Sequence, residues 1–342
     1  MNRSHWGSRV LGVAAAAAML EDCGGSKGQP AWTAMTPMVR APLSGPTQSQ
    51  SWMLPGAHAK RDLLYVSLQY DDIVVVYNYR TGNEVGILQG FNYPAGQCVD
   101  ASGDVWVTNE GEYSVVEYAH GGKHPLRTLN TDNYPFGCSI DPTTENLAVV
   151  TFNESSRVGD VDIFSKASGV PMSYSSSSCN DMSSPGYDNK GNLYLLARNS
   201  STTVCELPHG GTALRTVSVD VTITAAVGVM WDGKHITLTD GNYQNTRTSV
   251  IYRATESHSG NLKVVGSTQV TCYDRGNDLH APFIVGKRNT PVNRQEGDAI
   301  VGADYFCSSD ALEFWHYPVG GNPFKTIALD EAPNGQAVSI SK

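Results

Sequence analysis

The chain has 342 residues, which is enough for two ordinary domains or for one large all-β domain. Its formal net charge of −9 and its dispersed Lys and Arg residues provide no basic surface, which argues against nucleic acid as a partner. Gly, Tyr and turn dipeptides are plentiful, and beyond residue 20 no helical apolar period is sustained, so the composition favours β structure.

The first 22 residues have the features of a signal peptide. Arg3 and Arg9 precede the apolar run VLGVAAAAAML at 10–20, which is too short to span a bilayer. The following LEDCGGSKGQP resembles the bacterial lipoprotein signal, in which the Cys, here Cys23, is lipidated and becomes the new N-terminus. Glu21 and Asp22 replace the small residues of that signal, so an ordinary secretory signal is the alternative.

We therefore expect an extracytoplasmic protein, either periplasmic or on the cell surface. It would touch a membrane only through a lipid on Cys23, or be secreted if Cys23 is not lipidated. Residues 23–60 are rich in Gly, Ser, Pro, Gln and Ala without periodicity, and they predict a flexible tether.

A repeated pattern begins at residue 92. NYPAGQCVD at 92–100 returns as NYPFGCSID at 133–141, a spacing of 41 residues, and periods near 40 are typical of propellers. The first copy leads into four short β-like runs at 96–100, 105–109, 114–118 and 125–129, and the unit then recurs with drift. An Asp ends the first run of four units and is expected to accept a backbone N–H in the turn that follows: Asp100, Asp141, Asp188 and Asp232.

The two ends of this region complement each other. Residues 61–88 supply the second, third and fourth runs of a unit without the first, and PNGQAV at 333–338 matches PAGQCV at 94–99 in four of six places. A ring closed by pairing of the C-terminal strand with the N-terminal blade explains both observations and removes exposed strand edges. The sequence thus predicts an all-β, six-bladed β-propeller over 61–342, with an insertion at 288–296 and with these blades: 61–90 plus 333–341, 93–130, 134–174, 183–218, 224–267 and 279–329.

These motifs resemble the NHL-repeat and SMP-30/gluconolactonase-like six-bladed propellers. Blades of that class open with Pro-x-Gly, pass through an apolar-Asp-x-x-Gly turn and continue into a run such as VWVTN, here at 105–109. The resemblance covers 61–342 and implies that ligands meet the face formed by the loops before each inner strand and the loops between second and third strands. The residues expected to rim that face are Asn92, Tyr93, Asn109, Glu110, Asn133, Tyr134, Asn153, Glu154, Asn180, Asp181, Asp240, Asn242, Asn277, Asp278, His280, Asp304 and Glu331.

Side-chain oxygens dominate this set, which suits a hard cation such as Ca²⁺ or a polyhydroxylated ligand. The simpler interpretation is that Asn and Asp are common in turns for conformational reasons. In SMP-30-like enzymes a divalent metal is held by Glu, Asn and Asp ligands and an Asp acts as base. Weak candidates for such ligands here are Glu110, Asn153, Asn242 and Asp304, while equivalent blade positions hold Leu68, Phe152 and Arg198.

Apart from Cys23, the chain has six cysteines, and an oxidising compartment makes disulfides plausible. Cys98 and Cys138 occupy inner strands of neighbouring blades and could meet across the gap between them; separate burial as core residues is the alternative. The remaining preferred pairs are Cys179 with Cys205 and Cys272 with Cys307.

Two functions stay open at this level. The first is an extracytoplasmic, monomeric binding module that presents its loop face to a protein, a glycan or a small molecule. The one G-x-S-x-G match, GGSKG at 24–28, lies in the predicted tether and not at the strand-to-helix turn of a nucleophile elbow, and the sequence has no H-E-x-x-H motif or P-loop, which favours this interpretation. The alternative is a metal-dependent hydrolase or lactonase of the SMP-30 kind, in which the metal would polarise a carbonyl.

Overall fold

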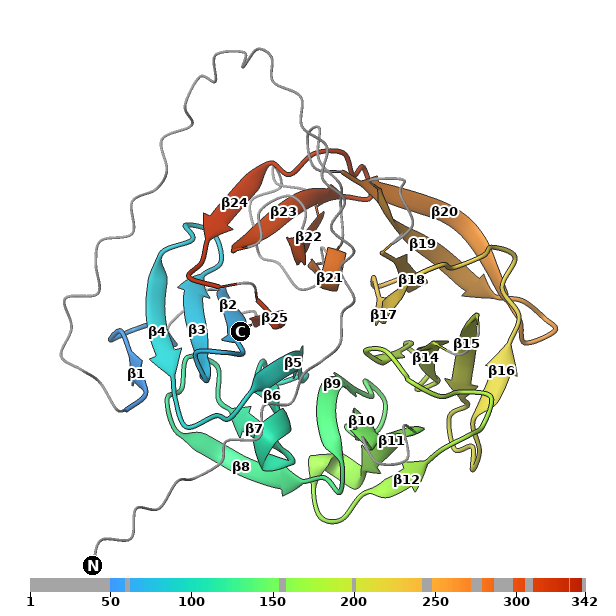
Figure 1. The fold of residues 1–342 in the computed structure, drawn as a ribbon, viewed down its shortest axis with the longest axis horizontal. Coiled ribbons are helices and arrows are strands. Elements are labelled where there is room, and N and C mark those ends of the chain that lie inside the picture. Colours follow the sequence, from blue (N-terminus) through green and yellow to red (C-terminus); the bar gives the residue numbers. More distant parts are fainter. Residues whose placement is uncertain are drawn as a thin grey trace, which may run out of the picture. The chain divides into compact units, whose positions relative to one another are not determined.

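The computed structural model describes residues 50–58, 62–153, 158–198, 201–241, 248–271, 279–285, 298–304, 310–331 and 333–339. In these residues the strands form six antiparallel sheets, arranged in a ring in Figure 1. Two single-turn 3-10 helices, η1 (Glu110–Glu112) and η2 (Ser165–Ala167), interrupt the loops. The fold is therefore the predicted all-β, six-bladed propeller.

The closing blade takes strands from both ends of the described chain. Its β25 pairs antiparallel with β2, from Leu63 opposite Ser339 to Ser67 opposite Gly335, so the predicted closure is confirmed. β1 pairs with the outer strand β4, and residues 52–53, in the stretch expected as a tether, are thus part of this blade. In spatial order the strands are β1 (Trp52–Met53), β4 (Glu84–Leu88), β3 (Ile73–Asn78), β2 (Leu63–Leu68) and β25 (Gly335–Ser339).

The other five blades are consecutive four-stranded meanders. We number them in chain order. Blade 1 has β5 (Pro94–Val99), β6 (Val105–Asn109), β7 (Ser114–Tyr118) and β8 (Pro125–Asn130). Blade 2 has β9 (Tyr134–Ile140), β10 (Leu147–Asn153), β11 (Val158–Phe164) and β12 (Met172–Tyr174). Blade 3 has β13 (Gly186–Tyr187), β14 (Leu193–Arg198), β15 (Thr202–Leu207) and β16 (Arg215–Val217).

The last two meanders complete the ring. Blade 4 has β17 (Ala226–Trp231), β18 (Ile236–Asp240), β19 (Ser249–Glu256) and β20 (Leu262–Val270). Blade 5 has β21 (Leu279–Val285), β22 (Asp298–Asp304), β23 (Ala311–Tyr317) and β24 (Lys325–Ala328). The predicted insertion at 288–296 lies outside the described residues.

The core lies between blades rather than inside a single layer. Strands such as β2 and β6 are buried along their whole length, because each blade packs a neighbour on both of its faces. One cluster joins apolar side chains of the closing blade with those of blade 1, for example Leu63 and Val107. Stacking of this kind explains why the second strands read as continuous apolar runs rather than as alternating ones.

Glycines allow the inner strands to approach one another near the axis. A Cβ added at Gly96 would lie 2.2 Å from the carbonyl oxygen of Phe136 in the next blade, and one at Gly335 would lie 2.3 Å from that of Ala95. No real side chain tolerates such distances, so these positions require glycine. The Gly of the Pro-x-Gly pattern thus allows neighbouring inner strands to pack closely at the axis.

The four predicted turn aspartates all accept backbone hydrogen bonds. The Oδ1 atom of each receives an N–H from the residue two positions on, at 2.7 Å for Asp100 and at 2.8 Å for the other three, Asp141, Asp188 and Asp232. Their structural role in the turns is therefore confirmed.

Two of the three predicted cysteine pairs are disulfides in the structure. Cys98 on β5 is bonded to Cys138 on β9, with the Cα atoms 5.6 Å apart, so this bond joins the inner strands of blades 1 and 2. Cys179 is bonded to Cys205 of β15. The third pair, Cys272 with Cys307, and the lipidation candidate Cys23 lie outside the described residues. The two bonds are consistent with an oxidising, extracytoplasmic environment.

Candidate functional site

The loops before the inner strands and the loops between second and third strands meet at one end of the ring. The amide of Glu110, in the β6–β7 loop, donates to the carbonyl of Tyr93, and the amide of Gly111 donates to that of Asn92. At the closing blade, the amide of Asn334 donates to the carbonyl of Ser67. The face expected to carry the site is thus formed by the predicted loops.

Four tyrosines gather on the part of this face that the closing blade, blade 1 and blade 2 share. Tyr70, Tyr93 and Tyr113 are 74%, 46% and 38% exposed, and Tyr134 is half-buried. The rings of Tyr70 and Tyr93 meet edge to face with centroids 6.3 Å apart, and those of Tyr113 and Tyr134 lie 4.6 Å apart. Two aromatic pairs therefore stand on adjacent loops with their surfaces open to solvent.

Two of these tyrosines have an unusual backbone conformation. Tyr93 and Tyr113 have φ values of 57° and 50°, in the left-handed region that a bulky residue adopts only at a cost of about 1–3 kcal/mol. Gly or Asn would fit these positions with less strain. Tyrosine is therefore an unusual residue for the backbone at both places.

The loop segments that carry the four tyrosines and their neighbouring loop are rich in carboxylates. In the segments 69–72, 89–93, 110–113, 131–134 and 329–334 there is no Lys, Arg or His. We call the four tyrosines together with the acids of these segments the tyrosine face. Its acids are Asp71, Asp72, Glu110, Glu112, Asp132, Asp330 and Glu331.

Backbone amides hold two of the acids against the tyrosines. Asp72 Oδ1 accepts the amide N–H of Tyr93 at 2.8 Å, and Glu331 Oε1 accepts that of Tyr70 at 2.9 Å. A third acid, Glu112, accepts from the side-chain amide of Asn92 at 3.2 Å through Oε1. The carboxylates are thereby fixed beside the rings, and each keeps a second oxygen.

Glu110 is the most perturbed acid of this face. Burial raises its pKa to about 7, and the hydrogen bond from Gln69 Nε2 to its Oε2, 2.9 Å long, opposes the shift. A carboxyl group with this pKa exchanges its proton near neutral pH, which general acid–base chemistry and pH-dependent binding both require.

Other rim candidates have structural partners. Asn109 Oδ1 accepts the amide of Asn92 at 2.7 Å, and Asn153 donates to Asn133 Oδ1 at 2.9 Å. Asp240 accepts the amides of two residues in the loop before β17, Thr224 and Ala225. Asn109 and Asp240 thus hold their loops through backbone amides, in line with the simpler interpretation, whereas Asn133 and Asn153 bond to each other.

The remaining rim candidates lie near blade 3 or outside the described residues. Asn180 and Asp181 lie in the loop before β13, where the carbonyl of Asp181 accepts from the amide of Arg198. Glu154, Asn242, Asn277 and Asp278 lie outside the described residues, as do the side chains of His280 and Asp304. Of the four metal-ligand candidates, only Glu110 and Asn153 have described side chains, so the cation site stays a prediction.

Several members of the tyrosine face were not singled out from the sequence. They are Tyr70, Asp71, Asp72, Glu112, Tyr113, Asp132 and Asp330. A usable signal exists in QYDD at 69–72 and EGEY at 110–113. Each combines a tyrosine with two acids in the same loop of successive blades, where turn formation alone would favour Gly, Asn or Pro.

A separate cavity of about 680 Å³ lies on the axis of the ring. All six inner strands line it, and so do turns at the end of the ring opposite the tyrosine face, such as 100–103. Its larger side chains include Tyr187, Trp231 and Phe283, with Gln97 and Gln336 as amide groups. None of the described rim candidates lines this cavity.

The opposite end of the ring carries polar clusters that stabilise the fold. Single carboxylate oxygens of Asp100, Asp104 and Glu117 lie within 4.8 Å of one another. The nearest cation is Arg127, whose Nε lies 2.5 Å from Glu117 Oε2. Burial raises the pKa of Glu117, while the Arg127 guanidinium opposes that shift. Arg127 thus balances the charge of Glu117, the buried member of the three carboxylates.

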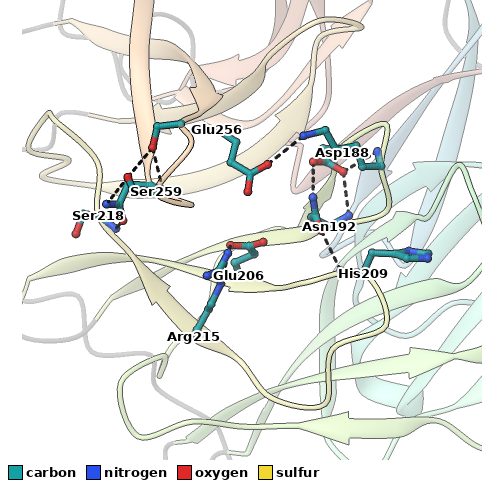
Figure 2. A network of polar contacts seen from close by, with 11 residues as sticks. Asp188, Asn192, Glu206, His209, Arg215, Ser218, Glu256 and Ser259 are labelled. Atoms are coloured by element: carbon teal, nitrogen blue, oxygen red, sulfur yellow. Dashed lines mark hydrogen bonds and ion pairs between the residues drawn. The ribbon is translucent and has the colours of Figure 1, made fainter.

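Blade 3 repeats this arrangement. Figure 2 shows Glu206 facing Arg215, whose Nη2 lies 2.7 Å from Glu206 Oε2. In the nearby turn Asp188 accepts from Asn192 through both carboxylate oxygens. Lys190 Nζ lies 3.0 Å from an oxygen of Glu256 in blade 4 and links the two blades. At this end of the ring these acids are therefore paired with side chains of the protein itself.

Among the described residues, no helix has the length and hydropathy needed to cross a membrane.

Comparisons with known proteins identify the fold alone. No protein-family model matches the chain, and no curated protein matches its sequence. The structure is similar to a chain in the crystal structure of a nidogen/laminin complex, with 12% identity, 82% of this chain and 99% of that chain covered, and a TM-score of 0.59. A second similar structure is Kuenenia stuttgartiensis hydrazine synthase, with 12% identity, 79% of this chain and 84% of that chain covered, and a TM-score of 0.54.

A catalytically inactive virginiamycin B lyase from Staphylococcus aureus with quinupristin is a third similar structure. It shows 11% identity, coverage of 83% of this chain and 88% of that chain, and a TM-score of 0.51. Identities this low carry no activity across, because one fold hosts many functions. The chain is a β-propeller.

Proposed function

We propose that the protein is an extracytoplasmic binding module that holds a soluble partner on the tyrosine face. The observation that carries this proposal is the placement of Tyr93 and Tyr113, exposed aromatic side chains on left-handed backbone. Tyrosine gives a binding surface a large contact area at low entropic cost. A partner explains their presence, whereas the fold would be better served by glycine or asparagine.

The scaffold suits this role. Rigid stacked blades fix the loops, as binding interfaces require. The fold is shared with a chain in a nidogen/laminin complex, so participation in a protein complex is compatible with such a propeller.

We also propose that the module is anchored through a lipid on Cys23. The support is the sequence VLGVAAAAAMLEDC at 10–23, together with the two disulfides of the propeller. An anchor at the end of a polar segment would leave the propeller free to meet a soluble partner.

Site-specific photo-crosslinking in cells that express the full chain tests the binding role. A benzophenone amino acid would replace Tyr70 in one version and Val170, exposed on the η2–β12 loop at the opposite face, in the matched control. We expect a discrete adduct from position 70 that is lost when Tyr93→Asn is added. Equal adducts from both positions, or an adduct indifferent to Tyr93→Asn, would contradict the proposal.

The hydrolase alternative is a separate prediction, supported here only by a rim acid, Glu110, with a raised pKa. Metal analysis of the purified protein and a screen of lactones and esters test it. Catalysis that depends on a bound divalent metal would establish this alternative.

A further inference from the structure

We propose that the tyrosine face selects a basic polypeptide segment, whose Lys or Arg side chains lie against the tyrosine rings and between the carboxylates. This inference rests on the proposed function and names the chemistry of the partner. It is carried by the charges and the geometry of the face.

The charge of the face is of one sign. Five of its seven acids are exposed: Asp71, Asp72, Glu112, Asp132 and Asp330. No cationic residue occurs in the five segments that form the face, in contrast to the opposite end of the ring, where Arg127 and Arg215 each lie against a buried acid. An acidic ligand would be repelled here, and a basic one would be attracted over several ångströms.

The rings add a second, short-range preference for cations. A guanidinium or an ammonium over a tyrosine ring gains about 0.5–1 kcal/mol at an exposed site. The Tyr70–Tyr93 pair has Asp72 and Glu331 fixed beside it through backbone amides, and the Tyr113–Tyr134 pair adjoins Glu112 in sequence. Each pair thus combines an aromatic surface with an ordered carboxylate, and both attract the same kind of group.

The layout of the pairs favours an extended chain over a single small cation. One pair joins the closing blade to blade 1, and the other joins blade 1 to blade 2. A segment that crosses blade 1 would meet both pairs in succession. A neutral glycan would stack on the rings and donate hydroxyl hydrogen bonds to the carboxylates, but only a cationic ligand would also gain from their charge.

Calorimetric titration of the purified full chain with a synthetic peptide of alternating Gly and Lys tests the inference. A second peptide carries Gln in place of Lys. We expect the Lys peptide to bind at least about 10-fold more tightly at low salt, and the difference to shrink as salt screens the charges.

A double variant, Asp72→Asn with Glu331→Gln, removes two charges, while each amide oxygen can still accept the backbone N–H that the carboxylate accepted. We expect binding of the Lys peptide to weaken about 3–30-fold, because one exposed and one half-buried charge are lost. Its matched control is Glu145→Gln with Glu256→Gln, which removes two exposed charges at the other end of the ring and should leave binding unchanged. Tyr70→Ala should weaken binding about 2–5-fold.

Equal affinities for the Lys and Gln peptides, or a double variant that binds like its control, would overturn the inference. The proposed function would still stand if the Tyr93-dependent adduct of the crosslinking experiment persisted. If position 70 gave no adduct even with Tyr93 in place, the proposed function would fail as well, so the two failures are distinguishable.

Discussion

Gly96 on β5 faces the carbonyl oxygen of Phe136 on β9 so closely that an added Cβ would lie 2.2 Å from it. The obstacle is backbone, which cannot rotate away as a side chain can. We expect Gly96→Ala to lower the free energy of unfolding by about 3 kcal/mol or more. Gly228→Ala, on the inner strand of blade 4, is the control, since its Cβ would meet only Ser184, with Cβ at 3.3 Å and the carbonyl oxygen at 3.6 Å. Equal urea midpoints for the two variants would contradict the close-approach argument.

The Cys98–Cys138 bond should stabilise the ring by constraining the unfolded chain. Its ends are 40 residues apart in sequence, and a loop of that length predicts about 4 kcal/mol. Replacing both residues with Ala should cost that amount in urea unfolding. Replacing Cys179 and Cys205, which are 26 residues apart, should cost slightly less. Loss of well under 1 kcal/mol in the first variant would show that the bond constrains little.

Glu110 should make stability depend on pH below neutrality. Burial raises its pKa from 4.5 to about 7, so the folded protein retains a proton that the unfolded chain has released. Its contribution is therefore fully present below about pH 4.5 and is lost as the pH rises to about 7, a change of roughly 3 kcal/mol or less. Glu110→Gln should remove this slope in denaturation measured at several pH values. The exposed Glu145→Gln should retain it, and an unchanged slope in Glu110→Gln would assign the effect elsewhere.

The pair formed by Glu206 and Arg215 should be sensitive to loss of its cation. The Glu206 side chain is buried, and burial raises its pKa against the opposing effect of Arg215. Arg215→Met leaves the acid without that partner and should destabilise the protein by about 1–3 kcal/mol, since Arg215 is half exposed. Adding Glu206→Gln to Arg215→Met should recover part of the loss in a double-mutant cycle. Strict additivity would mean that the two side chains do not interact.

Lipidation predicts a simple fractionation result. The full chain should sediment with membranes and carry a diacylglyceryl group on Cys23, and Cys23→Ser should appear in the soluble extracytoplasmic fraction. The mass of the mature N-terminus provides the measurement. A mature chain that begins at another residue would exclude the lipoprotein signal and favour the ordinary secretory one.

The ring could be predicted from sequence because its repeats impose local rules. Gly96 and Gly335 are glycines because backbones meet there, and Asp100 and Asp141 are aspartates because their turns need an acceptor. Such requirements recur once per blade and therefore appear as a pattern. The same register places Cys98 and Cys138 on the inner strands of neighbouring blades and so predicts their pairing, whereas Cys179 with Cys205 is a preference among several pairings.

The site was harder to predict because it belongs to no single repeat. Tyr93 and Tyr134 were singled out, whereas Tyr70 and Tyr113 were not, since they lie in loops where the repeat sets no rule. Their grouping depends on how the closing blade and blades 1 and 2 bring three loops together. The sequence also does not reveal the short strand β1 at Trp52–Met53, because two residues give no period to detect.

Closure by β25 has a consequence for how the molecule is made. The strand that completes the closing blade is synthesised after the other strands of the ring, while its partner β2 is one of the earliest of them. The circle can therefore close only after the other five blades have been synthesised, and until then the inner edge of β2 lacks its partner strand. Once closed, the circle cannot open by fraying of a single terminus without giving up the β2–β25 ladder, which favours long persistence in an environment that contains proteases.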